Sequence, residues 1–332
     1  MPLDRHASRF LEMLAAAGET RGRYEHADER RHALSNLAVL VDPPGDTGIE
    51  DVHDRTLAVE GGVLALRVYS PLGATGKMTP GMVFFHGGGW VAGSLETHDG
   101  LCRRLAQESG CRVVAVGYRL APEHPFPQAL EDGCAAFCHV ATVSQDFGVD
   151  PARLGIAGDS AGGTLAAAIC HMSRNERLGA GKFPDIAFQL LICPILDVHG
   201  ESEARRQLAD GYFLDRDTLL RDLELYCPGQ DRSDPRLSPL LAKDFSGLPP
   251  AIIHTGQFDP FRDEGEAYAA KLSGAGVPVR NLCHPGMIHY FYCMPRMIPY
   301  AREAARMIGA DIRETVKLRA SAGAVKSASG LP

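Results

Sequence analysis

Short apolar runs alternate with stretches of helical pattern along most of the chain. Because helical stretches separate the runs, the alternation predicts a mostly parallel β-sheet with helices on both of its faces. Two earlier runs flank Gly61-Gly62 and predict a hairpin. In a sheet of this kind, catalytic and binding groups gather beyond the carboxyl ends of the strands. The runs predicted to form strands are 56–60, 63–69, 82–85, 112–116, 154–157, 186–192, 251–254 and 277–282.

Two parts of the chain depart from this alternation. Residues 1–50 read as two helices. Residues 198–248 contain no strand-like run and so interrupt the alternation of strands and helices. Long excursions at the catalytic end of a sheet often act as lids, so we predict that both parts form a helical cap. A solvated excursion is the alternative for the second part. The catalytic domain then comprises 51–197 and 249–318, and the tail 319–332 is predicted to be disordered.

The composition excludes several classes of protein. The 332 residues are 45% hydrophobic and 23% charged, which is typical of a folded chain large enough to bury a substantial core. A formal net charge of −7, with no basic stripe, argues against binding to nucleic acid. The N-terminal sequence has no apolar signal core, and nowhere do 18 apolar residues follow one another. We therefore predict a cytoplasmic protein without stable membrane insertion.

Nine cysteines lie mostly in apolar surroundings, and their odd number argues against a framework of disulfides. Buried free thiols are the simpler interpretation. Cys134, Cys138 and His139 cluster on one predicted helix, but no second ligand pair at zinc-like spacing accompanies them. We therefore expect no metal site.

The segment Gly158-Asp159-Ser160-Ala161-Gly162 stands between a strand-like run and a helix of small residues. In that setting the pattern Gly-x-Ser-x-Gly predicts a nucleophile elbow, a turn so sharp that the serine adopts strained backbone angles. The flanking glycines leave room for the strand and the helix to approach each other. The segment therefore predicts a serine hydrolase with Ser160 as its nucleophile.

A serine hydroxyl needs a base to take its proton, and on such a fold the acid and then the base follow the serine along the chain. Among the histidines beyond Ser160, His284 and His289 both follow the last predicted strand. His289 is farther along the loop, where the chain can turn back over the sheet. We favour His289 over His284.

The candidate for the acid is Asp259, which follows the strand-like run 251–254 and a short loop. Its place at the carboxyl edge of the sheet is where a carboxylate can orient the base. Asp197, which follows the preceding predicted strand, is the main rival. Asp263 and Glu264 lie one helical turn further on and are alternatives that could instead cap the following helix.

Backbone amides for a developing oxyanion are offered by the loop His86-Gly87-Gly88-Gly89-Trp90, directly after a predicted strand. The N–H of Ala161, the residue after the nucleophile, would add another donor. A phosphate-binding loop is the alternative for a glycine run, but no Gly-Lys-Ser or Gly-Lys-Thr follows this one.

Taken together and in this order, the motifs make residues 50–310 resemble the hormone-sensitive-lipase-like family of esterases, the bacterial branch of the α/β-hydrolases. The aspartate before the nucleophile resembles that of the subgroup with a Gly-Asp-Ser-Ala-Gly elbow. The motifs are His86-Gly87-Gly88-Gly89-Trp90, 118–127 (Tyr-Arg-Leu-Ala-Pro-Glu-His-Pro-Phe-Pro), Gly158 to Gly163, 259–264 (Asp-Pro-Phe-Arg-Asp-Glu) and Gly286-Met287-Ile288-His289.

The resemblance implies an α/β-hydrolase fold and a triad of Ser160, Asp259 and His289. It also implies a carboxylesterase that acts on small-molecule esters with short to medium acyl chains, needs no cofactor and can form a homodimer. The family often has a glycine after the last histidine, where this chain has Tyr290; the larger side chain would narrow the pocket or shift the loop. The oxyanion donors that the resemblance implies are the N–H groups of Gly88, Gly89 and Ala161.

Side chains next to these motifs, and two in the second part of the predicted cap, are candidates for the substrate pocket. For Trp90, ordinary packing is the alternative, and for Asp159 a hydrogen-bonding role. The same triad would also suit lactones, amides or thioesters, and a ligand-binding protein on this fold is a further alternative, although such binders look degenerate at the histidine. The predicted pocket residues are Trp90, Asp159, Phe213, Leu214 and Ile288.

Overall fold

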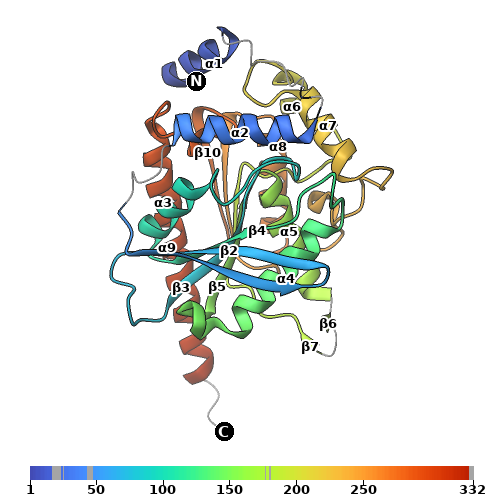
Figure 1. The fold of residues 1–332 in the computed structure, drawn as a ribbon. Helices are drawn as coiled ribbons and strands as arrows, with labels where there is room; N and C mark the ends of the chain where they lie inside the picture. The colour runs from blue at the N-terminus through green and yellow to red at the C-terminus, as the bar shows by residue number, and fades with distance from the viewer. Residues whose placement is uncertain (17–23, 25, 43–47, 176, 179–180, 329–332) are drawn as a thin grey trace.

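An eight-stranded sheet crosses the molecule (Figure 1). The computed structural model describes residues 1–16, 24, 26–42, 48–175, 177–178 and 181–328. Six neighbouring strands are parallel, and the antiparallel hairpin β1–β2 forms one edge, so the predicted sheet is confirmed. In spatial order the strands are β1 (Asp51–Val59), β2 (Gly62–Ser70), β4 (Arg112–Gly117), β3 (Thr79–Phe85), β5 (Val149–Asp159), β8 (Gln189–Ile192), β9 (Ala251–Phe258) and β10 (Val279–Ile288). A separate short pair joins β6 (Arg177–Leu178) and β7 (Gly181–Lys182).

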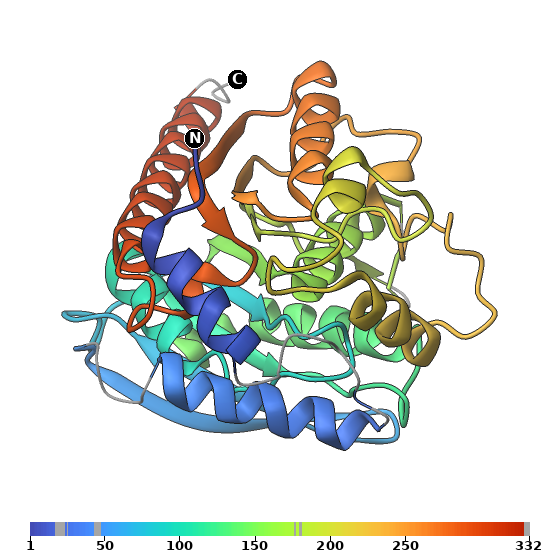
Figure 2. The ribbon, with the colours of Figure 1, turned by 90° about the horizontal axis from the view of Figure 1, so that it is seen from above.

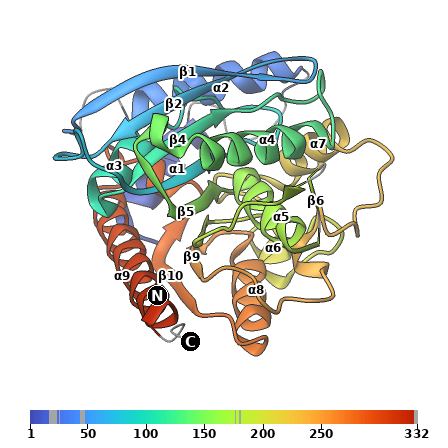
Figure 3. The ribbon, with the colours of Figure 1, turned by 90° about the horizontal axis from the view of Figure 1, so that it is seen from below.

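Side chains that alternate along the buried strands fill two cores, one on each face of the sheet. On β3, Val83 and Phe85 pack into one core, whereas Met82 and Phe84 pack into the other, as the period of two residues in a strand requires. The first core is covered by α4 (Gln128–Thr142), α5 (Ala161–Asn175) and α8 (Arg262–Gly274). The second is covered by α3 (Asp99–Ser109) and α9 (Tyr300–Ala328), as Figure 3 shows.

Several strands have other bounds than the sequence predicted; β1, β5 and β9, for example, are longer than their predicted runs. β8 begins at Gln189, so 186–188 precede the strand and do not belong to it. β10 runs to Ile288, beyond the predicted end at 282, because the pairing with β9 resumes after a shift of register between His284 and Ile288. Pro285 and Gly286 lie inside this stretch, and the long-range pairing with β9 resumes beyond them at Ile288.

The remaining helices lie beyond one end of the sheet (Figures 1 and 2). They come from the N-terminal segment and from the segment between β8 and β9, the two parts predicted to form a cap. Three single turns of 3₁₀ helix complete the described elements. The helices are α1 (Arg5–Ala16), α2 (Ala27–Val41), α6 (Glu203–Gln207) and α7 (Arg216–Tyr226), and the turns are η1 (Ser144–Phe147), η2 (Pro239–Leu241) and η3 (Phe291–Cys293).

The C-terminal segment differs from its prediction in part. Helix α9 continues to Ala328 and so includes residues 319–328, which were predicted to be disordered. Alanine is the best helix former, and this segment contains several alanines between its serines and glycine. Residues 329–332 lie outside the described part of the chain. Within that part, no helix is long and apolar enough to cross a membrane.

A buried pair of histidines joins β9 to β10. His254 Nδ1 and His284 Nε2 are 2.9 Å apart, and both side chains are shielded from solvent. Burial, and then the nearby His254, lower the pKa of His284 to about 3. The hydroxyl of Tyr300 is 3.1 Å from His284 Nδ1. His284 is therefore a neutral hydrogen-bonding member of the sheet.

This pair predicts a loss of stability in acid. An unfolded histidine has a pKa of about 6.5. Because the folded pKa of His284 is lower, the unfolded state binds the proton more readily, so the contribution is present above pH 6.5 and is lost as the pH falls toward 3. We expect the free energy of unfolding to change by about 1.4 kcal/mol for each pH unit in that window through this group. Urea denaturation at pH 7, 6 and 5 measures it.

The matched variants are His284→Gln and His53→Gln. His53 is half-exposed on β1, far from the β9–β10 pair. The pH dependence of the free energy of unfolding should become shallower in His284→Gln and stay unchanged in His53→Gln. Equal slopes in the three proteins would contradict the assignment of a neutral buried His284.

Candidate active site

Ser160, His289 and Asp259 form a continuous chain of hydrogen bonds. The Ser160 Oγ lies 3.1 Å from His289 Nε2, and His289 Nδ1 lies 3.0 Å from Asp259 Oδ2. Asp259 Oδ1 accepts a further hydrogen bond from the Phe261 N–H, at 2.8 Å. All three members of the chain are buried. When the Nδ1–H group donates a hydrogen bond to Asp259, Nε2 is free to accept the proton of the serine hydroxyl.

The turn that carries Ser160 has the geometry of the predicted elbow. Ser160 has a φ of 50°, in the left-handed region that is strained for a residue with a side chain. A Cβ atom on Gly162 would overlap the carbonyl oxygen of Phe85, and one on Gly158 would overlap the carbonyl of Gly162. Glycine is therefore required on both sides of the serine, because strand β5, helix α5 and the end of β3 meet there.

The two candidate bases have different surroundings. His284 lies within β10 and contacts His254 and Tyr300, whereas His289 directly follows the last residue of that strand. The prediction that both histidines lie in a loop is thus wrong for His284, since β10 extends past it. Of these two histidines, His289 is the one that contacts Ser160.

The other candidate carboxylates accept hydrogen bonds from backbone groups outside the triad. Asp197 accepts hydrogen bonds from the N–H groups of His199 and Gly200 and so stabilises its own turn. Asp263 accepts from the Ala204 N–H, near the start of α6. Glu264 accepts from the N–H groups of Leu196 and Asp197 and pairs with Arg205; burial raises its pKa to about 7. These groups hold the segment after β8 in place.

The loop after β3 presents free amides next to the serine. Gly88 and Gly89 have φ angles of 118° and 66°, conformations that favour glycine. Among the described residues, the N–H groups of Gly88 and Gly89 donate to no protein acceptor, and both glycines line the same cavity as Ser160. Such preoriented donors can stabilise an oxyanion. Ala161 is the first residue of α5, so its N–H belongs to the unpaired donors of a helix N-terminus.

Asp159 holds this loop in place through a hydrogen bond to Gly87. Its Oδ1 accepts the Gly87 N–H at 2.9 Å, and its Oδ2 lies 3.3 Å from both His98 Nε2 and the Tyr292 hydroxyl. The side chain has no exposed area, although the residue lies at the edge of the cavity. Asp159 therefore holds the oxyanion loop through hydrogen bonds.

A cavity of about 700 Å³ opens above Ser160 and His289. Phe213 and Leu214 line it, as predicted from the sequence, whereas Trp90 and Ile288 do not. Trp90 is fully buried and stacks on Tyr226, with ring centroids 4.5 Å apart, and Ile288 is buried in the second core. The placement of Trp90 depends on its packing against α7, and that of Ile288 on the pairing of β10. No local sequence pattern reveals either of these long-range contacts.

Residues from the N-terminal helices also line the cavity, and the sequence analysis did not identify them. Leu11 and Leu14 share one face of the first helix with Phe10, and this spacing shows that the face is apolar but not what it covers. The additional lining side chains from α1 and α2 are Leu11, Leu14, Arg30, Leu34 and Leu37.

Tyr290 forms part of the cavity wall. It lines the wall directly after His289 and adopts a φ of 65°. Its ring stacks on Phe213, with centroids 5.6 Å apart, and its hydroxyl donates to the Thr97 carbonyl at 3.4 Å. Phe213 in turn lies 6.1 Å from Phe10 of α1. Tyr290 therefore connects the histidine loop to both helical segments above the sheet.

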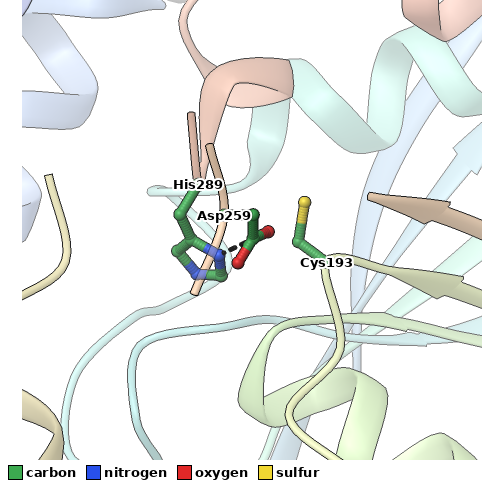
Figure 4. Close-up of side chains that lie close together, drawn as sticks. All are labelled: Cys193, Asp259 and His289. Carbon is green, nitrogen blue, oxygen red and sulfur yellow. Dashed lines mark hydrogen bonds and ion pairs between the residues drawn. The ribbon is translucent and has the colours of Figure 1, made fainter. Parts of the chain in front are cut away.

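Cys193 lies beside the acid and base (Figure 4). One ligand-type atom each from Cys193, Asp259 and His289 falls within 4.8 Å of the others. Burial, and then the charge of Asp259, raise the pKa of the Cys193 thiol well above its usual value. Metal ligation needs the thiolate, and both ring nitrogens of His289 already face Asp259 and Ser160. We interpret the group as the surroundings of the triad.

This combination of an elbow serine, a histidine, a buried carboxylate and free loop amides defines the site of a serine hydrolase. The chain belongs to the α/β-hydrolase fold family, whose model matches residues 82–293, and within it to the hormone-sensitive-lipase-like esterases. The fold and the family inferred from the motifs are thereby confirmed.

Named relatives support the same family. The chain is 41% identical to the carboxylic ester hydrolase LipN of Mycobacterium tuberculosis, over 71% of this chain and 63% of that protein. It is 38% identical to the carboxylesterase NlhH of the same organism, over 84% of this chain and 87% of that protein. A solved structure of a hyperthermophilic esterase from the archaeon Pyrobaculum calidifontis covers 95% of this chain and 99% of its own, with a TM-score of 0.87 and 37% identity.

Proposed function

We propose that this protein is a carboxylesterase that hydrolyses short- to medium-chain esters of small molecules through an acyl-enzyme. The observation that carries the proposal is the series of hydrogen bonds that links Ser160, His289 and Asp259. Ser160 and His289 line a cavity, and the backbone amides of Gly88 and Gly89 lie beside it. The ester-hydrolase names of the relatives agree with it. The chain needs no cofactor for this chemistry, because its own side chains supply the nucleophile and the base.

In the first half of the reaction, Ser160 Oγ attacks the ester carbonyl while His289 Nε2 takes the hydroxyl proton. The carbonyl oxygen becomes an oxyanion, which the N–H groups of Gly88, Gly89 and Ala161 would stabilise. The tetrahedral intermediate then collapses: the bond to the alcohol breaks, and His289 gives its proton to the leaving oxygen. The acyl group stays on Ser160.

In the second half, a water molecule attacks the acyl carbon. His289 takes a proton from the water, the oxyanion forms again at the same amides, and collapse releases the carboxylic acid. The proton returns to Ser160 Oγ, so the enzyme is regenerated. Asp259 accepts a hydrogen bond from the imidazole Nδ1–H throughout and stabilises the positive charge that the ring carries between these steps.

The helical segments 1–50 and 198–248 would act as a cap that gives the acyl and alcohol groups their binding site. Contacts with the segments after β3 and β4 support this role. Arg31 Nε of α2 donates to the Val91 carbonyl at 2.9 Å, and Arg31 Nη2 donates to the Ala121 carbonyl at 2.9 Å. The catalytic domain would comprise 51–197 and 249–318. The cytoplasmic location and the homodimer stay predictions from the sequence.

A series of p-nitrophenyl esters from acetate to palmitate tests the proposal. We expect kcat/KM to peak at a short or medium chain and to fall toward palmitate, because the cavity of about 700 Å³ ends at the helices above the sheet. A peak at palmitate would contradict the chain-length class. Matched anilide, thioester and lactone substrates test the other bonds that this triad could cleave, and faster turnover of any of them than of the esters would reassign the reaction.

A further inference from the structure

A charged pair forms part of the cavity wall. Arg30 of α2 and Asp222 of α7 both line the cavity that contains Ser160. Their Nη2 and Oδ2 atoms are 3.6 Å apart, and the side chains are 16% and 6% exposed. The two residues come from the two helical segments that the sequence placed above the sheet. The mechanism proposed above uses neither of them.

The pair is not fully satisfied by the protein. The 3.6 Å separation exceeds a direct hydrogen bond, and among the described residues Asp222 makes no other polar contact. Arg30 Nε is buried without a hydrogen-bond partner. Burying a carboxylate is costly unless hydrogen bonds compensate, and an apolar pair would join two helices with less penalty. A buried carboxylate that still has free acceptor sites facing a cavity therefore points to a ligand that supplies a donor.

The carboxylate lies next to the predicted oxyanion loop. A Cβ atom built on Gly89 would overlap Asp222 Oδ2, so this oxygen sits directly against the glycine. A substrate carbonyl bound at the Gly88 and Gly89 amides would thus have Asp222 as a near neighbour. The group that Asp222 contacts must be attached a few bonds from the reacting ester.

The chemistry of Asp222 favours a hydroxyl group as its partner. Burial raises the pKa of Asp222 to about 7, while Arg30 acts in the opposite direction. Near neutral pH the group therefore exists both as a carboxylate, which accepts a hydrogen bond, and as a carboxyl, which can also donate one. A hydroxyl both donates and accepts, so it fits either form. A substrate carboxylate would be repelled by the ionised form.

The rest of α2 offers the complementary apolar surface. Leu34 and Leu37 follow Arg30 by four and seven residues, so they continue the same face of the helix along the cavity. A substrate lying along this face would place a hydroxylated part beside Asp222 and a hydrocarbon part beside the leucines.

We propose that Asp222, held by Arg30, is a specificity-determining residue that binds a hydroxyl group carried by the substrate within a few bonds of the ester carbonyl. The favoured substrates are then hydroxylated small esters, such as esters of short hydroxy acids. This inference rests on the proposed esterase function and names the substrate class of the same site.

The test compares three esters of similar size in a pH-stat assay: ethyl butyrate, ethyl 3-hydroxybutyrate and 2-hydroxyethyl butyrate. The measured quantity is the ratio of kcat/KM for each hydroxylated ester to that for ethyl butyrate. A hydrogen bond to a charged group predicts a ratio of about 10 or more in the parent protein for at least one of them. Which ester is favoured tells whether the hydroxyl belongs to the acyl or to the alcohol part.

Three variants separate recognition from a structural role. Asp222→Leu should lower the ratio about tenfold, and Asp222→Asn, which keeps hydrogen-bonding atoms, should lower it less. Glu224→Gln removes a carboxylate from an exposed position of the same helix and should leave the ratio as in the parent. A purely structural pair would lower kcat/KM for all three esters together and leave the ratio constant. If Asp222→Leu fails to fold, the comparison of Asp222→Asn with the parent decides.

The outcomes distinguish this inference from the proposed function. Hydrolysis of ethyl butyrate with a ratio near 1 in all four proteins would overturn the role of Asp222 and leave the esterase function standing. Absence of hydrolysis of all three esters by the parent protein would overturn both. A parent ratio of about 10 that falls in the Asp222 variants and persists in Glu224→Gln would establish the hydroxyl subsite.

Discussion

Replacing Ser160 with alanine is expected to lower kcat for ester hydrolysis by about a million-fold, down to the small acceleration that binding and the oxyanion loop alone provide. The hydroxyl is the only nucleophile within hydrogen-bonding distance of His289 Nε2 among the described residues. Its loss leaves His289 and Asp259 in place without an atom to form the acyl bond. The measurement is kcat for p-nitrophenyl butyrate, with care to remove traces of the parent enzyme.

A matched control for this substitution is Ser173→Ala. Ser173 lies on α5, the same helix that begins after Ser160, and its hydroxyl donates to the Cys170 carbonyl at 2.8 Å. This variant should keep its activity within about a few fold, because surface and helix serines away from the site contribute little. Retention of more than about one part in a hundred of the activity in Ser160→Ala would show that another group is the nucleophile.

Asp259→Asn is expected to lower kcat by about ten-thousand-fold with little change in the fold. The carboxylate is completely buried and accepts hydrogen bonds from His289 Nδ1 and from the Phe261 N–H. An asparagine that turns its amide NH₂ group toward the imidazole would favour the tautomer with the proton on Nε2. That tautomer cannot take the proton of Ser160. Steady-state rates with the same ester, together with circular dichroism of the variant, test the expectation.

Asp197→Asn is the control that distinguishes the two candidate acids. Asp197 accepts backbone hydrogen bonds from His199 and Gly200, outside the chain that reaches Ser160. The substitution should affect stability more than kcat, since a side-chain amide oxygen can still accept one of those bonds. If Asp197→Asn lost as much activity as Asp259→Asn, the role of Asp259 as the orienting carboxylate would be refuted.

Much of the site follows from local patterns because its parts are attached to the ends of parallel strands. Ser160, Asp259 and His289 each come shortly after the residues that pair in β5, β9 and β10, and these strands end at the same edge of the sheet. The order of the strands is therefore enough to predict that these three residues lie close together. The strand order does not distinguish His284 from His289. That distinction depends on the pairing of β10 with β9, which continues through His284 across a shift of register.

The walls of the cavity were harder to predict. Trp90 adjoins the oxyanion loop in sequence, yet its ring turns into the core against Tyr226 of α7. Arg30 and Asp222 lie far apart along the chain, and nothing in either local sequence indicates that they meet. Contacts of this kind depend on how helices from distant parts of the chain pack above the sheet, and periodicity within one helix does not specify its partner.

By itself the sequence determined the elements whose geometry is local: the apolar runs that form the sheet, the glycines that permit the elbow at Ser160, and the order of nucleophile, acid and base. These depend on backbone sterics and on the alternation of side chains, which neighbouring residues settle. Only the tertiary structure decided which histidine lies in β10, that Tyr290 stacks on Phe213, and that Asp222 faces Gly89. Those features are contacts between segments that are distant in the sequence, so long-range packing and the burial of charge determine them.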